Sequence, residues 1–291
     1  MYWHMKNLLE QIKQLPNGDN ILRLFNEAKQ ALGNSTLTIC DYNERGGDDV
    51  SKGYGRYEPE KGIIWIQMRH PDHVKEYILA HEIGHVMQGA NGFPRVSIRD
   101  ILRDWKEYNE HQELVHPDIV VRIHRLSDVL SDLLLDPGAD SFARANHLLS
   151  KDALLYMEER DIASICSIVL PAFDRERLCC GINEALDSIR GGTSPQSPQV
   201  MRALLETARF ATVYAIRSLR YSQEDLFDCL DKKYKEDQLI IYALGRELLN
   251  IVGYYNLNTI IGCQKAAKHL IANLQLPSEA VGLRTFQEWL T

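Results

Sequence analysis

The sequence predicts a mostly helical α+β fold, with a small antiparallel sheet near the N-terminus and a helical bundle at the C-terminus. Two observations support this class. Short runs of alternating or β-branched residues, separated by turn residues, lie within the first 68 positions. Most of the chain after them repeats apolar residues at the three- and four-residue spacing of a helix.

Composition sets broad limits. With 291 residues, 45% of them hydrophobic and 25% charged, the chain has the make-up of one large globular domain or two. The net charge of −7 gives no electrostatic reason to expect nucleic acid or an anionic membrane as partner. The six cysteines include no CxxC pair, and the N-terminus lacks the apolar core of a signal peptide. We therefore expect a cytoplasmic protein with reduced thiols.

Turn and cap residues delimit the N-terminal elements. Pro16-Asn17-Gly18 and Gly33 end two helices. A β-branched run then predicts a strand, and the turn at 58–62 makes the next two runs a hairpin. The predicted elements are helices at 4–15 and 21–32 and strands at 36–40, 55–57 and 63–68.

A third helix follows the hairpin, starting at Asp72 and running to Gly89. It contains the sequence HExxH, in which His81 and His85 are four residues apart. Such residues share one helix face, with about 5–6 Å between their Cβ atoms, so two imidazoles can bind one Zn²⁺. Glu82 can then take a proton from a zinc-bound water. The motif predicts a catalytic zinc site.

The rest of the chain reads as helices. Residues 91–126 are polar, and a helix at 98–111 could cover a cleft or be a solvated outer helix. The Gly- and Pro-containing stretch 191–198 is the best candidate for a linker between domains at 1–190 and 199–291. Further helices are predicted at 126–135, 139–150, 199–219, 223–234, 236–252, 258–274 and 278–290.

A catalytic zinc site takes three protein ligands, so a third His, Glu or Asp is needed. The tract 127–143 carries four aspartates at helical spacing, whose mutual repulsion a divalent cation would relieve. They are Asp128, Asp132, Asp136 and Asp140. Asp136 is the first choice, although it precedes Pro137 and also fits a helix N-cap. Asp140, one turn further on, could accept a hydrogen bond from the far nitrogen of a zinc-bound histidine.

Other third ligands stay open. Asp132 lies one turn before Asp136 and has the same donor chemistry. A histidine could also serve, the candidates being His111, His116, His124 and His147.

The stretch 136–143 reads Asp-Pro-Gly-Ala-Asp-Ser-Phe-Ala and resembles the Glu-x-x-Ala-Asp-x-Phe-Ala pattern of gluzincin metallopeptidases. Together with HExxH it is similar to the minigluzincins, the CAAX prenyl proteases and the ImmA/IrrE metallopeptidases. The resemblance covers roughly residues 53–89 and 127–150. Two features depart from the pattern. Asp136 is one methylene shorter than Glu, so its helix must approach the metal more closely, and Pro137-Gly138 interrupts what is normally continuous helix.

The resemblance implies a zinc-dependent endopeptidase acting on a peptide or protein substrate. His81, His85 and Asp136 would bind Zn²⁺, and Glu82 would be the general base. The strand at 63–67 would pair with extended substrate. Two alternatives remain: a regulatory or interaction protein that retains the metallopeptidase core with narrow or no peptidase activity, and a structural zinc site closed by a fourth ligand.

Overall fold

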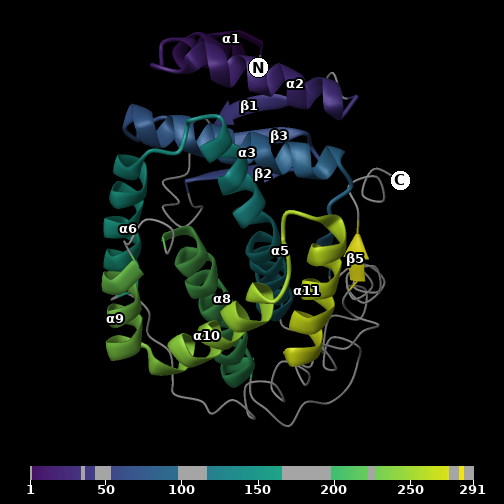
Figure 1. Ribbon diagram of the computed structural model, residues 1–291, viewed down its shortest axis with the longest axis vertical. Coiled ribbons are helices and arrows are strands. Elements are labelled where there is room, and N and C mark those ends of the chain that lie inside the picture. Colours follow the sequence, from purple (N-terminus) through teal and green to yellow (C-terminus); the bar gives the residue numbers. More distant parts are fainter. Residues whose placement is uncertain are drawn as a thin grey trace. The chain divides into compact units, whose positions relative to one another are not determined.

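The computed structural model describes residues 2–33, 37–42, 54–97, 117–165, 198–221, 227–274 and 282–284. Most of them are helical, with a three-stranded sheet and a two-stranded ribbon, so the predicted α+β class is confirmed (Figure 1). The elements are α1 (Tyr2–Lys13), α2 (Gly18–Ala31), β1 (Thr38–Asp41), β2 (Gly55–Glu58), β3 (Ile63–Ile66), α3 (Asp72–Ala90), β4 (Arg95–Ser97), α5 (Pro117–Ala145), α6 (Lys151–Ile165), α8 (Pro198–Tyr221), α9 (Phe227–Asp237), α10 (Leu239–Gly253), α11 (Ile260–Asn273) and β5 (Gly282–Arg284).

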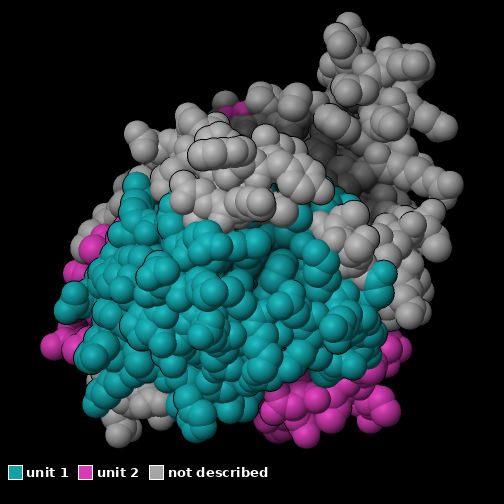
Figure 2. All heavy atoms as spheres, turned by 90° about the horizontal axis from the view of Figure 1, so that it is seen from above, with its two compact units in different colours: residues 1–93, 135–159, 285–291 teal, residues 94–134, 160–284 magenta. Residues whose placement is uncertain are grey.

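The described chain divides into two compact units, coloured separately in Figure 2. Unit 1 comprises residues 1–93, 135–159 and 285–291, and unit 2 comprises residues 94–134 and 160–284. Both units are discontinuous in sequence, and the second half of α5 belongs to unit 1. The proposed linker lies, up to residue 197, outside the described residues, so a domain boundary there stays a prediction.

The sheet of unit 1 has the strand order β1-β3-β2. β2 and β3 form the predicted antiparallel hairpin, but β1 pairs with β3 in parallel, so the expectation of a purely antiparallel sheet is wrong. Apolar alternation marks a strand without encoding the direction of its partner. Because β3 is paired on both sides over Ile63–Ile66, the expectation that this strand pairs with substrate is also wrong.

Helix α3 is the centre of unit 1. It packs against β2, β3 and α2, and residues on all its faces are buried. Buried Glu76 accepts hydrogen bonds from the backbone nitrogen and the Nδ2 of Asn17, at 2.6 and 2.9 Å. The carboxylate thus satisfies a donor at the start of α2 and fixes that helix to α3.

Helix α5 runs unbroken from Pro117 to Ala145, with Pro137 inside it. The expected break between helices at 126–135 and 139–150, and the N-cap role of Asp136, are therefore wrong. An interior proline removes one helical hydrogen bond and costs about 3 kcal/mol. Burial of Leu133, Leu134 and Leu135, each at most 3% exposed, opposes that cost.

In unit 2, β4 pairs with β5 at the residue pair Val96 and Leu283. Residues 282–284 are thus a strand, and the helix predicted over 278–290 is wrong there. Tertiary pairing overrides the short helical periodicity. Ser131 of α5 holds the ribbon, because its Oγ accepts from the Val96 nitrogen at 2.9 Å.

Helices α8 to α11 confirm the helices predicted at 199–219, 223–234, 236–252 and 258–274 to within a few residues. Inside unit 2, Asp161 forms an ion pair with Arg217 at 2.9 Å and accepts a hydrogen bond from the Tyr221 hydroxyl at 2.7 Å. The predicted helix at 98–111 lies outside the described residues. Within the described part of the chain, no helix is long and apolar enough to cross a membrane.

Candidate metal centre

Local signals set the ends of α3, as the sequence predicted. At its start, the carbonyl of Pro71 accepts from the nitrogens of Val74 and Lys75, both at 3.0 Å. At its end, Gly92 takes a φ of 78°, which favours glycine. The Phe93 nitrogen then donates to the Gln88 carbonyl at 3.0 Å in a Schellman-type stop. The HExxH residues lie in the interior of a well-delimited helix.

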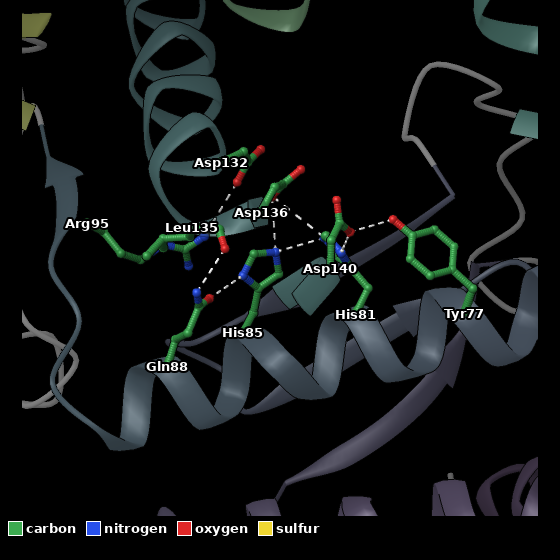
Figure 3. A network of polar contacts seen from close by, with 9 residues as sticks. All are labelled: Tyr77, His81, His85, Gln88, Arg95, Asp132, Leu135, Asp136 and Asp140. Carbon is green, nitrogen blue, oxygen red and sulfur yellow. Dashed lines mark hydrogen bonds and ion pairs between the residues drawn. The ribbon is translucent and has the colours of Figure 1, made fainter. Parts of the chain in front are cut away.

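Three side chains converge between α3 and the second half of α5 (Figure 3). His81, His85 and Asp136 each offer one ligand atom, and these atoms lie within 4.8 Å of one another. The two Nε2 atoms are 3.0 Å apart, and Asp136 Oδ1 is 3.2 Å from His85 Nε2 and 3.6 Å from His81 Nε2. All three residues are buried, at 7–8% exposure. This is the only group of three or more such residues in the described part of the chain.

These separations fit a metal ion. Zinc binds imidazole nitrogen and carboxylate oxygen at about 2.0–2.1 Å, so two ligands of a tetrahedral site are about 3.3 Å apart. The observed separations of 3.0 to 3.6 Å bracket that value. The triad could therefore hold a metal ion without rearrangement of the backbone.

Hydrogen bonds to the far ring nitrogens fix how the two histidines are protonated. His81 Nδ1 lies 2.6 Å from Asp140 Oδ1 and donates to it. His85 Nδ1 lies 3.0 Å from Gln88 Oε1. Gln88 must present its oxygen there, because its Nε2 donates to the Leu135 carbonyl at 2.8 Å. Both Nδ1 atoms therefore carry protons, and in neutral rings both Nε2 lone pairs face Asp136.

Three acceptors that converge in a buried site require a cation between them. Without a metal that cation is a proton. Burial lowers the pKa of the His81 imidazole, but the charges of Asp140 and Asp136 and the hydrogen bonds to both carboxylates outweigh burial and raise the pKa to about 10. A metal ion that binds here must displace this proton.

A close helix crossing brings the ligands together. A Cβ added to Gly84 would lie 3.0 Å from the Ala139 Cα and 3.2 Å from its Cβ. Gly84 lies between the two histidines on α3, and Ala139 lies between Asp136 and Asp140 on α5. Because Gly84 and Ala139 are small, the backbones of α3 and α5 can approach closely. The Asp136 side chain, one methylene shorter than Glu, requires this approach to reach the histidines.

Glu82 follows His81 on α3 and lies against strand β2. A Cβ built on Gly55 would lie 3.2 Å from both the Cγ and the Oε1 of Glu82. The carboxyl group is buried, with the residue 6% exposed. A side chain at position 55 would therefore clash first with Ile78 and then press on the Glu82 carboxyl group.

The other candidates take different places. Asp140 lies behind His81, as predicted. Asp132 is outside the triad and faces Arg95 at 3.8 Å, while Asp128 and His147 are exposed. His111, His116 and the side chain of His124 lie outside the described residues.

Sequence reasoning missed two residues that hold the centre. Gln88 supports His85, and the Tyr77 hydroxyl donates to Asp140 Oδ1 at 2.6 Å. Their positions offered a signal, since Tyr77 lies four residues before His81 and Gln88 three residues after His85. Both spacings place a side chain on the face of the histidines.

Comparison with known proteins adds no relative: no family model, no curated protein and no solved structure matches the chain.

We expect Asp136→Asn to lose most of its metal affinity while keeping its fold, because Asn has nearly the same shape but is a much weaker metal ligand. Asp132→Asn should stay near wild type in both respects. Metal content by mass spectrometry and melting by circular dichroism test both variants. If Asp132→Asn loses the metal and Asp136→Asn keeps it, the ligand assignment is wrong.

Gly84→Ala should lower the free energy of unfolding by about 1–3 kcal/mol, because overpacking forces α3 and α5 apart. It should also weaken metal binding, since the donors move apart with the helices. Gly253→Ala is the control, because a Cβ there meets nothing within 4 Å. Unchanged metal affinity in Gly84→Ala would show that the close crossing does not position the ligands.

Zinc affinity should rise with pH, by about tenfold per unit between about pH 6 and pH 8, because binding releases one proton from His81. The affinity rises with pH because the raised pKa of His81 keeps the metal-free site protonated below about pH 10. Competition with a chelator of known pH dependence measures the slope. A flat profile would contradict the proton–metal exchange.

Proposed function

We propose that this protein is a zinc-dependent endopeptidase of the gluzincin type, with His81, His85 and Asp136 as metal ligands. The observation that carries the proposal is the buried His-His-Asp triad with Glu82 adjoining a ligand. Bound zinc would lower the pKa of a water molecule toward about 7 and polarise the scissile carbonyl. The chain supplies the proton transfers, the ligand geometry and the substrate contacts.

Glu82 is the proposed general base. It neighbours His81 in sequence but lies outside the triad, so its carboxylate is available for proton transfer. In the proposed reaction Glu82 accepts a proton from the attacking water and passes it to the leaving amine. The carboxyl group lies beside β2, since a Cβ built on Gly55 would be 3.2 Å from its Oε1.

The edge of β2 is the proposed place for extended substrate, in the role that β3 cannot take. The Gln67 nitrogen donates to the Tyr54 carbonyl at 3.3 Å, which makes these two residues a hydrogen-bonded pair. By alternation, the backbone groups of Gly55 point away from β3. No described strand pairs with that edge. A substrate strand that pairs with Gly55 would place its peptide groups next to Glu82.

Deep burial of the candidate metal centre favours narrow or no peptidase activity at the same site. All three ligands are 7–8% exposed. A site so enclosed suits an enzyme of narrow specificity, or a regulatory protein that retains the metallopeptidase core and turns over little or no peptide.

Glu82→Gln separates these functions. It should bind zinc as the wild type does, because Glu82 is no ligand, and peptide cleavage should fall by at least about 10²–10⁴-fold. Zinc content and cleavage of a denatured protein substrate are measured side by side, with His81→Ala as the variant that loses the metal. Cleavage by Glu82→Gln at the wild-type rate would refute the mechanism, whereas a zinc-loaded wild type that cleaves nothing would favour the regulatory role.

A further inference from the structure

We propose that Tyr77 is a positioning residue of the metal centre, acting through Asp140 on His81. The inference rests on the metal site of the proposed function and not on peptidase activity. Tyr77 lies one helical turn before His81 on α3 and is 1% exposed. Its hydroxyl donates to Asp140 Oδ1 at 2.6 Å, and the same oxygen accepts from His81 Nδ1 at 2.6 Å (Figure 3).

Two donors on one oxygen restrict the Asp140 carboxylate more than one donor would. The terminal torsion of an aspartate is broad, so a single hydrogen bond leaves the carboxyl plane free to turn. Tyr77 and His81 approach Oδ1 from the same helix, one turn apart, and together they define the direction of its lone pairs. The His81 ring, and with it the direction of Nε2, is then set by the rigid frame of α3 and α5.

Ring packing supports the same role. The Tyr77 and His81 rings meet edge to face, with centroids 5.7 Å apart and an interplanar angle of 62°. Tyr77 therefore limits the tilt of the imidazole directly as well as through Asp140. His85 has a different support, because its Nδ1 donates to the neutral amide of Gln88. Among the described residues, the tyrosine–carboxylate pair supports His81 and not His85.

Unit 2 provides a matched control for a purely structural effect. Tyr221 is fully buried, and its hydroxyl donates to a buried aspartate, Asp161, at 2.7 Å. Neither residue belongs to the metal-binding group. Tyr221→Phe therefore removes the same kind of hydrogen bond as Tyr77→Phe, but from an aspartate that is paired with Arg217 and not with a proposed metal ligand.

The test measures zinc affinity of the full chain by chelator competition and records the visible spectrum of the cobalt-substituted protein. Tyr77→Phe should weaken zinc binding about 3- to 10-fold, less than the 10- to 100-fold typical when a hydrogen-bond partner of a metal-bound histidine is lost. It should also shift the cobalt spectrum, while Tyr221→Phe leaves both unchanged. In the Asp140→Asn background, Tyr77→Phe should have no further effect, because the two act as one unit.

Tyr77→Phe with wild-type zinc affinity and spectrum would overturn the inference, as would full additivity with Asp140→Asn. If Tyr77→Phe does not fold, 3-fluorotyrosine at position 77, a stronger donor of the same shape, should shift the cobalt spectrum, and an unshifted spectrum overturns the inference. A wild type that binds no zinc refutes the metal site and Tyr77 together. A wild type that binds zinc but cleaves nothing refutes the peptidase alone.

Discussion

The candidate metal centre depends on how closely α3 and α5 cross. Gly84 and Ala139 meet at the crossing, where an added Cβ would lie 3.0 Å from backbone. The histidines flank Gly84 on one helix and the aspartates flank Ala139 on the other, so one contact aligns all four side chains. His81–Asp140 and Gln88–Leu135 hydrogen bonds then tie the helices on both sides of that contact. The short Asp136 carboxylate reaches the histidines because of this approach.

The electrostatics of the side chains at this crossing favours binding of a cation. Asp140 and Gln88 accept hydrogen bonds from the two Nδ1–H groups, so both Nε2 atoms turn their lone pairs toward Asp136. A buried group of three acceptors is unfavourable without a positive charge, and a divalent ion supplies more of it than a proton. Glu82, which follows His81 on α3, lies close to Gly55, so this residue connects the candidate metal centre to strand β2.

The sequence contained the chemistry of the site but not all of its geometry. HExxH predicted the helix and two candidate ligands, because residue spacing alone places His81 and His85 on one face. The Asp-x-x-Ala-Asp-x-Phe-Ala pattern allowed Asp136 to be proposed as a ligand. Pro137, however, suggested that a helix starts there. The tertiary packing that keeps this interior proline within a helix leaves no local signal in the sequence. The parallel pairing of β1 and the strand at 282–284 depend on contacts between distant segments, which periodicity does not encode. Spacing places Tyr77 and Gln88 on the face of the histidines, but their bonds to Asp140 and Leu135 join segments far apart in the sequence.

X-ray absorption at the zinc edge of the purified, zinc-loaded chain tests the central claim most directly. We expect one zinc per chain, with two imidazole nitrogens and light oxygen ligands at about 2.0–2.1 Å, and loss of the imidazole signal in a chain that lacks His81 and His85. Sulfur ligands at about 2.3 Å, or zinc that remains bound without the two histidines, would contradict it.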